Sequence, residues 1–162
     1  MTDDQVTPRQ IDAFKRFIKL LPHGQDLTLV ILKGHLLIEE QVRQIIDERV
    51  KIPQSLRDAR LTCYQAICIA EAFCSEAQKY IWKAVKKLNK IRNDLAHKTE
   101  PVGLDDRIDD FVQSIPWHVP VEENKKKRFE FALWALFEAV SSLVERPTAT
   151  MLELGKGKDE SP

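Results

Sequence analysis

The sequence has few of the residues that build β-sheets. Its 162 residues include only five glycines. Runs of β-branched residues are short, whereas leucine, alanine, lysine, glutamate and glutamine, which favour helices, are common. The composition therefore predicts an all-α fold. The length suits one hydrophobic core, so we expect a single helical domain over residues 1–146 and a flexible C-terminal tail over residues 147–162.

Cysteine and long apolar runs are also scarce. The three cysteines, Cys63, Cys68 and Cys74, form no CxxC pair. Their odd number fits neither a disulfide framework nor a zinc site, so we expect free thiols in a reducing cytoplasm. No stretch approaches the roughly 18 apolar residues of a membrane span, and residues 1–7 lack the apolar segment of an export signal. A cytoplasmic protein, neither exported nor embedded in a membrane, is expected.

Charge of one sign is not in excess. Lysine plus arginine and aspartate plus glutamate both total 25, so the formal net charge is zero. The global field of a dedicated nucleic-acid binder is missing, and any such function must depend on a local patch. A Gly-rich phosphate loop, a nucleophile elbow and a metal-ligand pattern are missing too, which disfavours a small-molecule enzyme. We predict no cofactor and no metal.

Start and stop signals predict an up-and-down helical bundle of four main helices plus short extra helices. A capping box at Thr7 to Gln10 begins a short outer helix, and a second capping box at Ser75 to Gln78 begins a later one. The four main helices are expected over residues 26–49, 61–73, 75–97 and 122–145. Shorter features are a turn over 54–60, a weak helix over 107–115 and an extended connector over 116–120.

The 26–49 helix is expected to be the central helix of the bundle. The first half of the 26–49 helix is apolar on nearly all sides, and the 61–73 helix is too apolar to lie on a surface. The last helix places its apolar residues on one stripe, which comprises Phe129, Leu133, Leu136, Phe137, Val140 and Val144. His35 lies among apolar residues, so it is expected to be a core histidine with its hydrogen bonds satisfied rather than a ligand.

The 75–97 helix carries an arginine on its apolar face. At about 100° per residue, Arg92 fills the gap on the arc that holds Ile81, Val85, Leu88 and Leu95. A buried unpaired charge is unfavourable, so Arg92 must reach water, pair with a carboxylate, or face a groove or partner subunit. Glu39 and Glu40 of the central helix are the expected partners.

Polar residues converge near the end of the same helix. Asn93 and His97 are four positions apart and share a flank. The polar face carries Lys79, Lys83, Lys86, Lys87 and Lys90, with Lys98 just beyond, and a phosphate chain fits such a face. Histidine can move the proton of a ribose hydroxyl, and arginine can hold a phosphate, so Arg92, Asn93 and His97 are suited to acid-base cleavage of RNA without a metal.

Arg92 to His97 match the R-x4-6-H motif of HEPN (higher eukaryotes and prokaryotes nucleotide-binding) domains, including the polar residue favoured after the arginine. The long apolar helix also resembles these domains and, more loosely, mannitol-repressor-like helical proteins. The resemblance covers roughly residues 25–145 in helix order and is specific only at the motif. It implies a metal-independent ribonuclease, a homodimer with facing motifs, and a toxin or defence effector with a nucleotidyltransferase-type or other antitoxin. The tyrosine that often follows the motif histidine by two residues is replaced by Thr99.

Two hypotheses remain open. The first is a HEPN-type endoribonuclease with Arg92, Asn93 and His97 as catalytic residues. The alternative is a non-catalytic helical regulator or interaction module that binds a protein or nucleic-acid partner, favoured by the zero net charge and the apolar last helix. From spacing alone, Arg92 and His97 also fit a capping arrangement at a helix C-terminus, and the lysines fit a solvated face.

Overall fold

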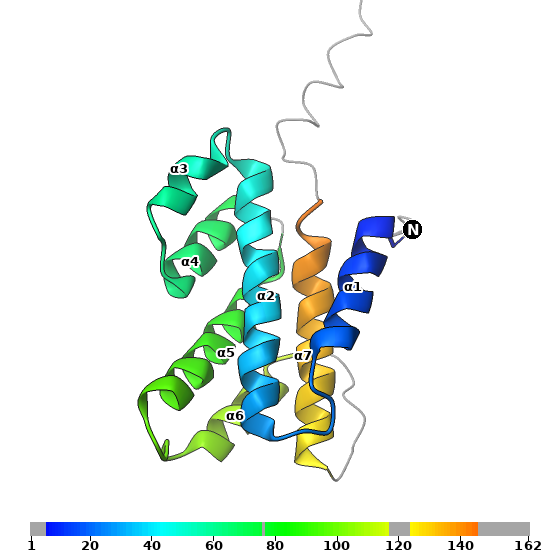
Figure 1. The fold of residues 1–162 in the computed structure, drawn as a ribbon, viewed down its shortest axis with the longest axis vertical. Helices are drawn as coiled ribbons and strands as arrows, with labels where there is room; N and C mark the ends of the chain where they lie inside the picture. Colours follow the sequence, from blue (N-terminus) through cyan, green and yellow to red (C-terminus); the bar gives the residue numbers. More distant parts are fainter. Residues whose placement is uncertain (1–5, 76, 117–123, 146–162) are drawn as a thin grey trace, which may run out of the picture.

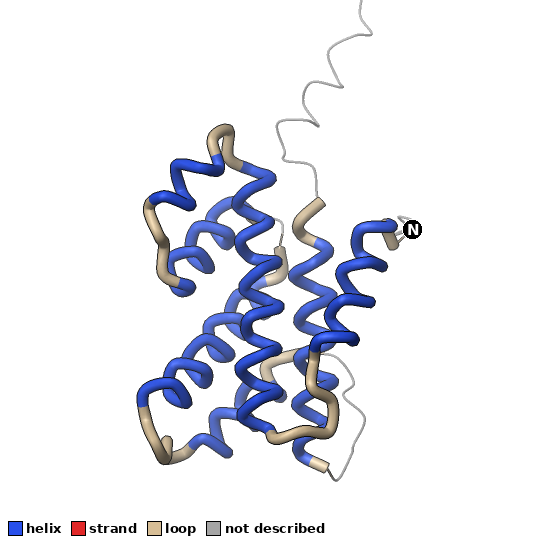
Figure 2. Tube along the Cα trace, in the orientation of Figure 1, coloured by secondary structure: helices blue, strands red, loops and turns tan. Residues whose placement is uncertain are grey.

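A computed structural model describes residues 6–75, 77–116 and 124–145, and all regular structure in these ranges is helical (Figure 2). This confirms the predicted all-α class and helical bundle. The seven helices of the described residues are α1 (Pro8–Leu20), α2 (Leu27–Arg49), α3 (Pro53–Asp58), α4 (Cys63–Phe73), α5 (Lys79–His97), α6 (Leu104–Gln113) and α7 (Lys125–Ser142). Most of the connector expected over 116–120 and the whole 147–162 tail lie outside the described residues.

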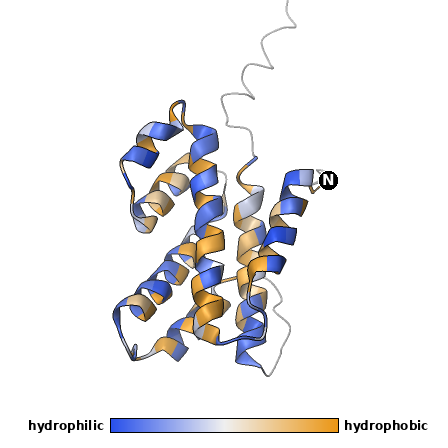
Figure 3. Ribbon diagram, in the orientation of Figure 1, coloured by the Kyte–Doolittle hydropathy of each residue, from blue (hydrophilic) through white to orange (hydrophobic). Residues whose placement is uncertain are grey.

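Helix α2 is central, as its sequence predicts. It packs against α4 and α5 on one side and against α7 on the other, while α1 covers α7 and α6 joins α5 to α7 (Figure 1). The first half of α2 is strongly hydrophobic (Figure 3). Gly34 lets α2 approach α7 closely, because a Cβ atom there would lie 2.5 Å from Leu133 Cδ1. None of the described helices has the length and apolar content that a membrane crossing requires.

Local capping explains where most helices begin. Thr7 and Gln10 form the predicted capping box of α1. Asp26 caps α2 by accepting from the backbone N–H of Thr28. Asn124 caps α7, which begins at Lys125. These side chains satisfy N–H groups that have no partner within the helix, so they fix its first turn.

The capping box expected at Ser75 does not start a helix. Helix α5 begins at Lys79, after Gln78, which caps it without a side-chain hydrogen bond. Just after α4, the Ala77 N–H donates to the Cys74 carbonyl over 3.0 Å. The tight connection between two packed helices therefore overrides the local capping preference.

The prediction that the 61–73 helix is too apolar to lie at a surface is wrong for part of this helix. Helix α4 buries Ala66, Ile67 and Ala70 against the core. Tyr64 and Phe73 are 55% and 41% exposed, because α2 and α5 pack on only one side of this helix. Apolar side chains on α4 therefore remain available at the surface.

Candidate functional site

The last two turns of α5 leave the core gradually. Ile81, Val85 and Leu88 are buried as predicted, and the core face continues at Ile91 rather than at Leu95. Arg92 and Leu95 are both half-buried. Arg92 therefore lies at the edge of the core, and its guanidinium can reach water without a buried carboxylate.

The expected pairing of Arg92 with Glu39 or Glu40 is wrong. Glu39 Oε1 accepts hydrogen bonds from Arg43 Nε and Nη2 at 3.0 and 2.7 Å. Glu40 pairs with Arg16 of α1. Arg43 competes successfully for Glu39 because it lies one turn away on the same helix. No carboxylate in the described part of the chain forms an ion pair with Arg92.

Arg92 instead contacts its neighbour in sequence. Its Nη1 donates to Asn93 Oδ1 over 3.0 Å, and both side chains are half-buried. A guanidinium has five N–H donors, so this bond fixes one edge and leaves further donors for a ligand. Asn93 is therefore well placed to orient Arg92.

His97 is exposed in the last turn of α5 and makes no hydrogen bond or ion pair with the described residues. It continues a stripe of exposed side chains at seven-residue spacing, after Lys83 and Lys90. Arg92 and His97 are five positions apart, so their side chains leave the helix about 140° apart. One copy of α5 thus presents the two residues in different directions.

Asp94 anchors the end of α5. Its carboxylate contacts Lys98 Nζ at 2.8 Å and Arg107 Nη1 of α6 at 2.9 Å. The Lys98 hydrogen bond, followed by the charge of Arg107, holds the pKa of Asp94 below its ordinary value. Lys98, a predicted RNA-binding residue, is therefore engaged by Asp94. The four-residue spacing to Lys98 could have indicated this pair, whereas the contact with Arg107 depends on the fold.

A groove of about 530 Å³ lies between α4 and the polar face of α5. Its lining includes five predicted site residues, which are Lys83, Lys86, Lys87, Lys90 and Asn93. Tyr64, Asn89 and Asp94 complete the lining and were not predicted. Lys79, Lys98, Arg92 and His97 are not part of its lining. We call this feature the lysine groove. It places an exposed tyrosine ring opposite a row of cations.

Part of the charge of the lysine groove is neutralised. Lys86 pairs with Glu71 of α4, and this hydrogen bond raises the pKa of Lys86. Lys87 pairs with Asp110 of α6 at 2.8 Å. Lys83 and Lys90 are exposed and form no ion pair within the described ranges. These two lysines are the cations most available to an external phosphate.

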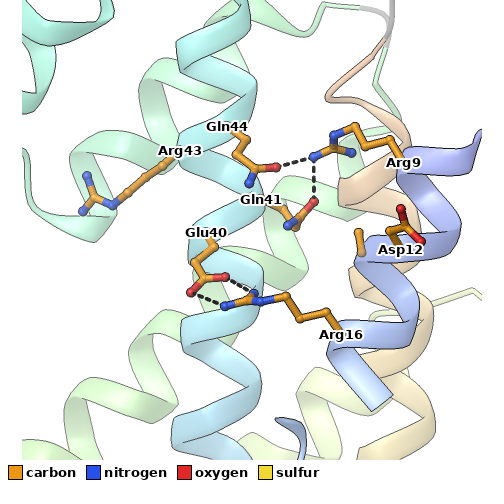
Figure 4. A pocket seen from close by; sticks show the side chains of 8 residues that line it. Arg9, Asp12, Arg16, Glu40, Gln41, Arg43 and Gln44 are labelled. Carbon is orange, nitrogen blue, oxygen red and sulfur yellow. Dashed lines mark hydrogen bonds and ion pairs between the residues drawn. The ribbon is translucent and has the colours of Figure 1, made fainter. Parts of the chain in front are cut away.

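A second groove, of about 500 Å³, lies between α1 and α2, and Glu40 is part of its lining. Figure 4 shows Arg16 reaching from α1 to Glu40, and Arg9 donating to the side-chain oxygens of Gln41 and Gln44. Arg43 points to the other side of α2. Glu40 therefore joins α1 to α2 and does not belong to the Arg92 site.

A polar cluster around the buried His35 lies between α2, α4 and α5. His35 is only 3% exposed, and its Nε2 is 3.1 Å from Asn89 Oδ1. His35, Glu39 and Cys63 each offer one possible metal-ligand atom, and these atoms all lie within 4.8 Å of one another. The sequence does not indicate this cluster, because His35 and Glu39 of α2 meet Cys63 of α4 only through helix packing. His35 is a core histidine as expected, but its Nδ1 has no hydrogen-bond partner.

Comparison of the chain with protein-family models, curated proteins and solved structures found no match. The resemblance to HEPN domains consequently depends on Arg92 to His97 and on the order of the helices.

Proposed function

We propose that this chain is a metal-independent, HEPN-type endoribonuclease that acts as a homodimer in the cytoplasm. The observation that supports this function best is the lysine groove, which brings four lysines and Tyr64 together with Asn93 of the Arg92–His97 segment. Exposed cations can follow a phosphate backbone, and an exposed aromatic ring can stack on an unpaired base. Single-stranded RNA fits this combination.

The reaction uses a proton-transfer group and a phosphate-binding group. His97 removes the proton of the ribose 2′-hydroxyl or delivers a proton to the leaving oxygen. Arg92 binds the phosphate and stabilises the charge that develops on it, and Asn93 holds Arg92 through the 3.0 Å hydrogen bond. Arg92, Asn93 and His97 all lie in the last two turns of α5, so one rigid helix holds the three side chains.

The divergence of Arg92 and His97 supports the homodimer. Because they leave α5 about 140° apart, a single copy does not readily direct both at one phosphate. A two-fold axis near the end of α5 would bring Arg92 of one copy toward His97 of the other. Bound RNA phosphate would then separate the two arginines. An antitoxin, of the nucleotidyltransferase type or another kind, would act by covering this composite site.

The test is cleavage of single-stranded RNA by purified protein in the presence of EDTA. His97→Ala is expected to lower the cleavage rate by about 10²–10⁴-fold, because a general acid-base group contributes on that order. His23→Ala is the matched control, since His23 is a half-exposed histidine that pairs with Glu130. Cleavage by His97→Ala at the rate of the unmodified protein would refute the proposal and indicate a contaminating nuclease.

RNA binding is tested separately by charge reversal in the lysine groove. Replacing Lys83 and Lys90 with glutamate should weaken binding and reduce its dependence on salt, because fewer counterions are released. Lys19→Glu on α1 is the control, since α1 packs on α7 away from the groove. An equal loss in the control would show that only net charge matters.

The alternative function is a non-catalytic helical module that binds a protein partner. The apolar stripe of the last helix, which motivated this hypothesis, is buried within the chain. The exposed apolar residues of α4, Tyr64 and Phe73, favour a docking surface there instead. In-cell activity that survives Arg92→Ala and His97→Ala but is lost with Phe73→Glu would support this function over cleavage.

A further inference from the structure

The polar cluster around His35 contains a ring nitrogen with an unusual environment. Asn89 Oδ1 lies 3.1 Å from His35 Nε2 and can only accept, so with the amide in this orientation Nε2 carries the proton. Burial lowers the pKa of His35, which favours the neutral ring. Nδ1 then carries no proton, and its lone pair has no hydrogen-bond partner. Water cannot readily supply one, because the side chain is only 4% exposed. Such a group is unfavourable unless something binds it.

The atom that faces Nδ1 is also electron-rich. Glu39 Oε2 lies 3.9 Å from Nδ1, which is too far for a hydrogen bond. The other carboxylate oxygen, Oε1, accepts both hydrogen bonds from Arg43. Zinc binds histidine nitrogen and carboxylate oxygen at about 2.0–2.2 Å. Two ligand atoms on one zinc ion are therefore separated by less than the sum of two such bonds, and the observed separation of 3.9 Å lies within that limit.

Cys63 supplies a third donor. Its Sγ is 3.5 Å from His35 Nε2. One ring nitrogen of His35, one carboxylate oxygen of Glu39 and this sulfur all lie within 4.8 Å of one another. Burial, followed by the negative charge of Glu39, raises the pKa of the Cys63 thiol to about 12. Without a cation the sulfur therefore keeps its proton. A divalent ion between the thiol and the carboxylate would replace that proton.

We propose that His35 Nδ1, Glu39 Oε2 and Cys63 Sγ bind one Zn²⁺ ion, with water in the fourth position. Nitrogen, oxygen and thiolate sulfur together form a donor set that zinc prefers. The Cys63 S–H bond breaks as the S–Zn bond forms, and one proton leaves to solvent. The thiolate and the Glu39 carboxylate balance the two positive charges of the ion, so Arg43 and Arg92 face a neutral centre.

The surroundings support the two ligands from α2. Asn89 holds the ring nitrogen that does not bind the ion, and Arg43 holds the carboxylate oxygen that does not bind it. Partners of this kind orient metal ligands, and their loss weakens metal affinity by about 10–100-fold. Tetrahedral zinc would bring Nδ1 and Oε2 to about 3.4 Å apart. Glu39, with its side chain 18% exposed, can make this small movement.

The zinc site is independent of the proposed RNA cleavage, and its test contains no RNA. The full chain is purified without chelator, and its zinc content is measured by elemental mass spectrometry. The chelator-treated protein is then titrated with Co²⁺, which gives a near-ultraviolet charge-transfer absorption when a thiolate binds it. We expect about one zinc per chain and this absorption in the unmodified protein.

Cys63→Ala should abolish the absorption, whereas the matched variant Cys68→Ala, which removes a half-buried thiol from the same helix, should retain it. Asn89→Ala should weaken Co²⁺ binding by about 10–100-fold. Circular dichroism checks that each variant is folded, and Glu39→Gln, which preserves side-chain size, replaces Cys63→Ala if that variant loses helix. Absence of the absorption from the unmodified protein, or its persistence in folded Cys63→Ala or Glu39→Gln, would overturn the proposal.

Discussion

Helices α5 and α7 pack against the same central helix but use their apolar residues differently. The apolar stripe of α7 is buried from Phe129 to Val140, and Val144, just beyond the helix, is buried too. On α5 the buried face ends at Ile91, and the following residues, 92–97, are half-buried or exposed. Helix α7 is thus committed to packing, whereas α5 combines packing in its first three turns with a polar end. The polar end is where substitution can change function without removing the core.

The largest expected effect is on the free energy of unfolding, when one leucine of each helix is replaced by alanine. Leu136→Ala in α7 removes a side chain that is fully buried, and it should lower the free energy of unfolding by about 2–5 kcal/mol. Leu95→Ala should cost clearly less, because Leu95 is half-buried and water can fill the space. Urea unfolding followed by circular dichroism measures both. Equal losses would show that the end of α5 is packed as firmly as α7.

An intermediate effect is expected where α7 meets α2. Gly34→Ala places a Cβ 2.5 Å from Leu133 Cδ1, so the two helices or the leucine must move. Overpacking of this kind should cost about 1–3 kcal/mol of unfolding free energy. The double variant with Leu133→Ala should lose less than the sum of the single losses, since the smaller side chain makes room. Strict additivity would contradict the close contact.

The smallest effect concerns the polar end of α5. The pKa of Asp94 is lower in the folded chain than its ordinary value of 3.8. The ionised carboxylate therefore stabilises the folded chain fully above pH 3.8. This stabilisation is lost as the pH falls through the lower pKa of the folded chain. Asp94→Asn should therefore reduce stability at pH 7 but lose its effect in strong acid. Urea unfolding at several pH values measures this. The same difference at every pH would show that Asp94 acts through packing rather than charge.

Local signals predicted much of the fold. The caps Thr7 and Asp26 fixed the starts of α1 and α2, and the period of the apolar residues in α7 identified its buried face. These features depend on neighbours within one helix, which a sequence displays directly. The start of α5 was mispredicted at Ser75, because the turn that leads out of α4 is set by how the two helices pack.

The candidate site was predictable only in part. Lys83, Lys86, Lys87 and Lys90 lie together as the helical period requires. The partner of Arg92 was not predictable, because Arg43 and Arg16 compete for the nearby carboxylates, and Arg16 comes from another helix. The meeting of His35 with Asn89 and Cys63 depends on three helices. Contacts between distant segments follow from tertiary packing, which spacing along one helix does not contain.

The contact between the first and last helices also constrains how the chain folds during synthesis. Helix α1 packs on α7, Phe17 stacks on Phe137 with ring centroids 4.4 Å apart, and Thr7 donates a hydrogen bond to Glu145. The ribosome makes α1 first and its partner surface last, so α1 must wait for nearly the whole domain before it can dock. Helices α2, α4 and α5 have their partners earlier. A nascent chain halted before α7 would therefore expose the apolar face of α1 and the far side of α2 to chaperones.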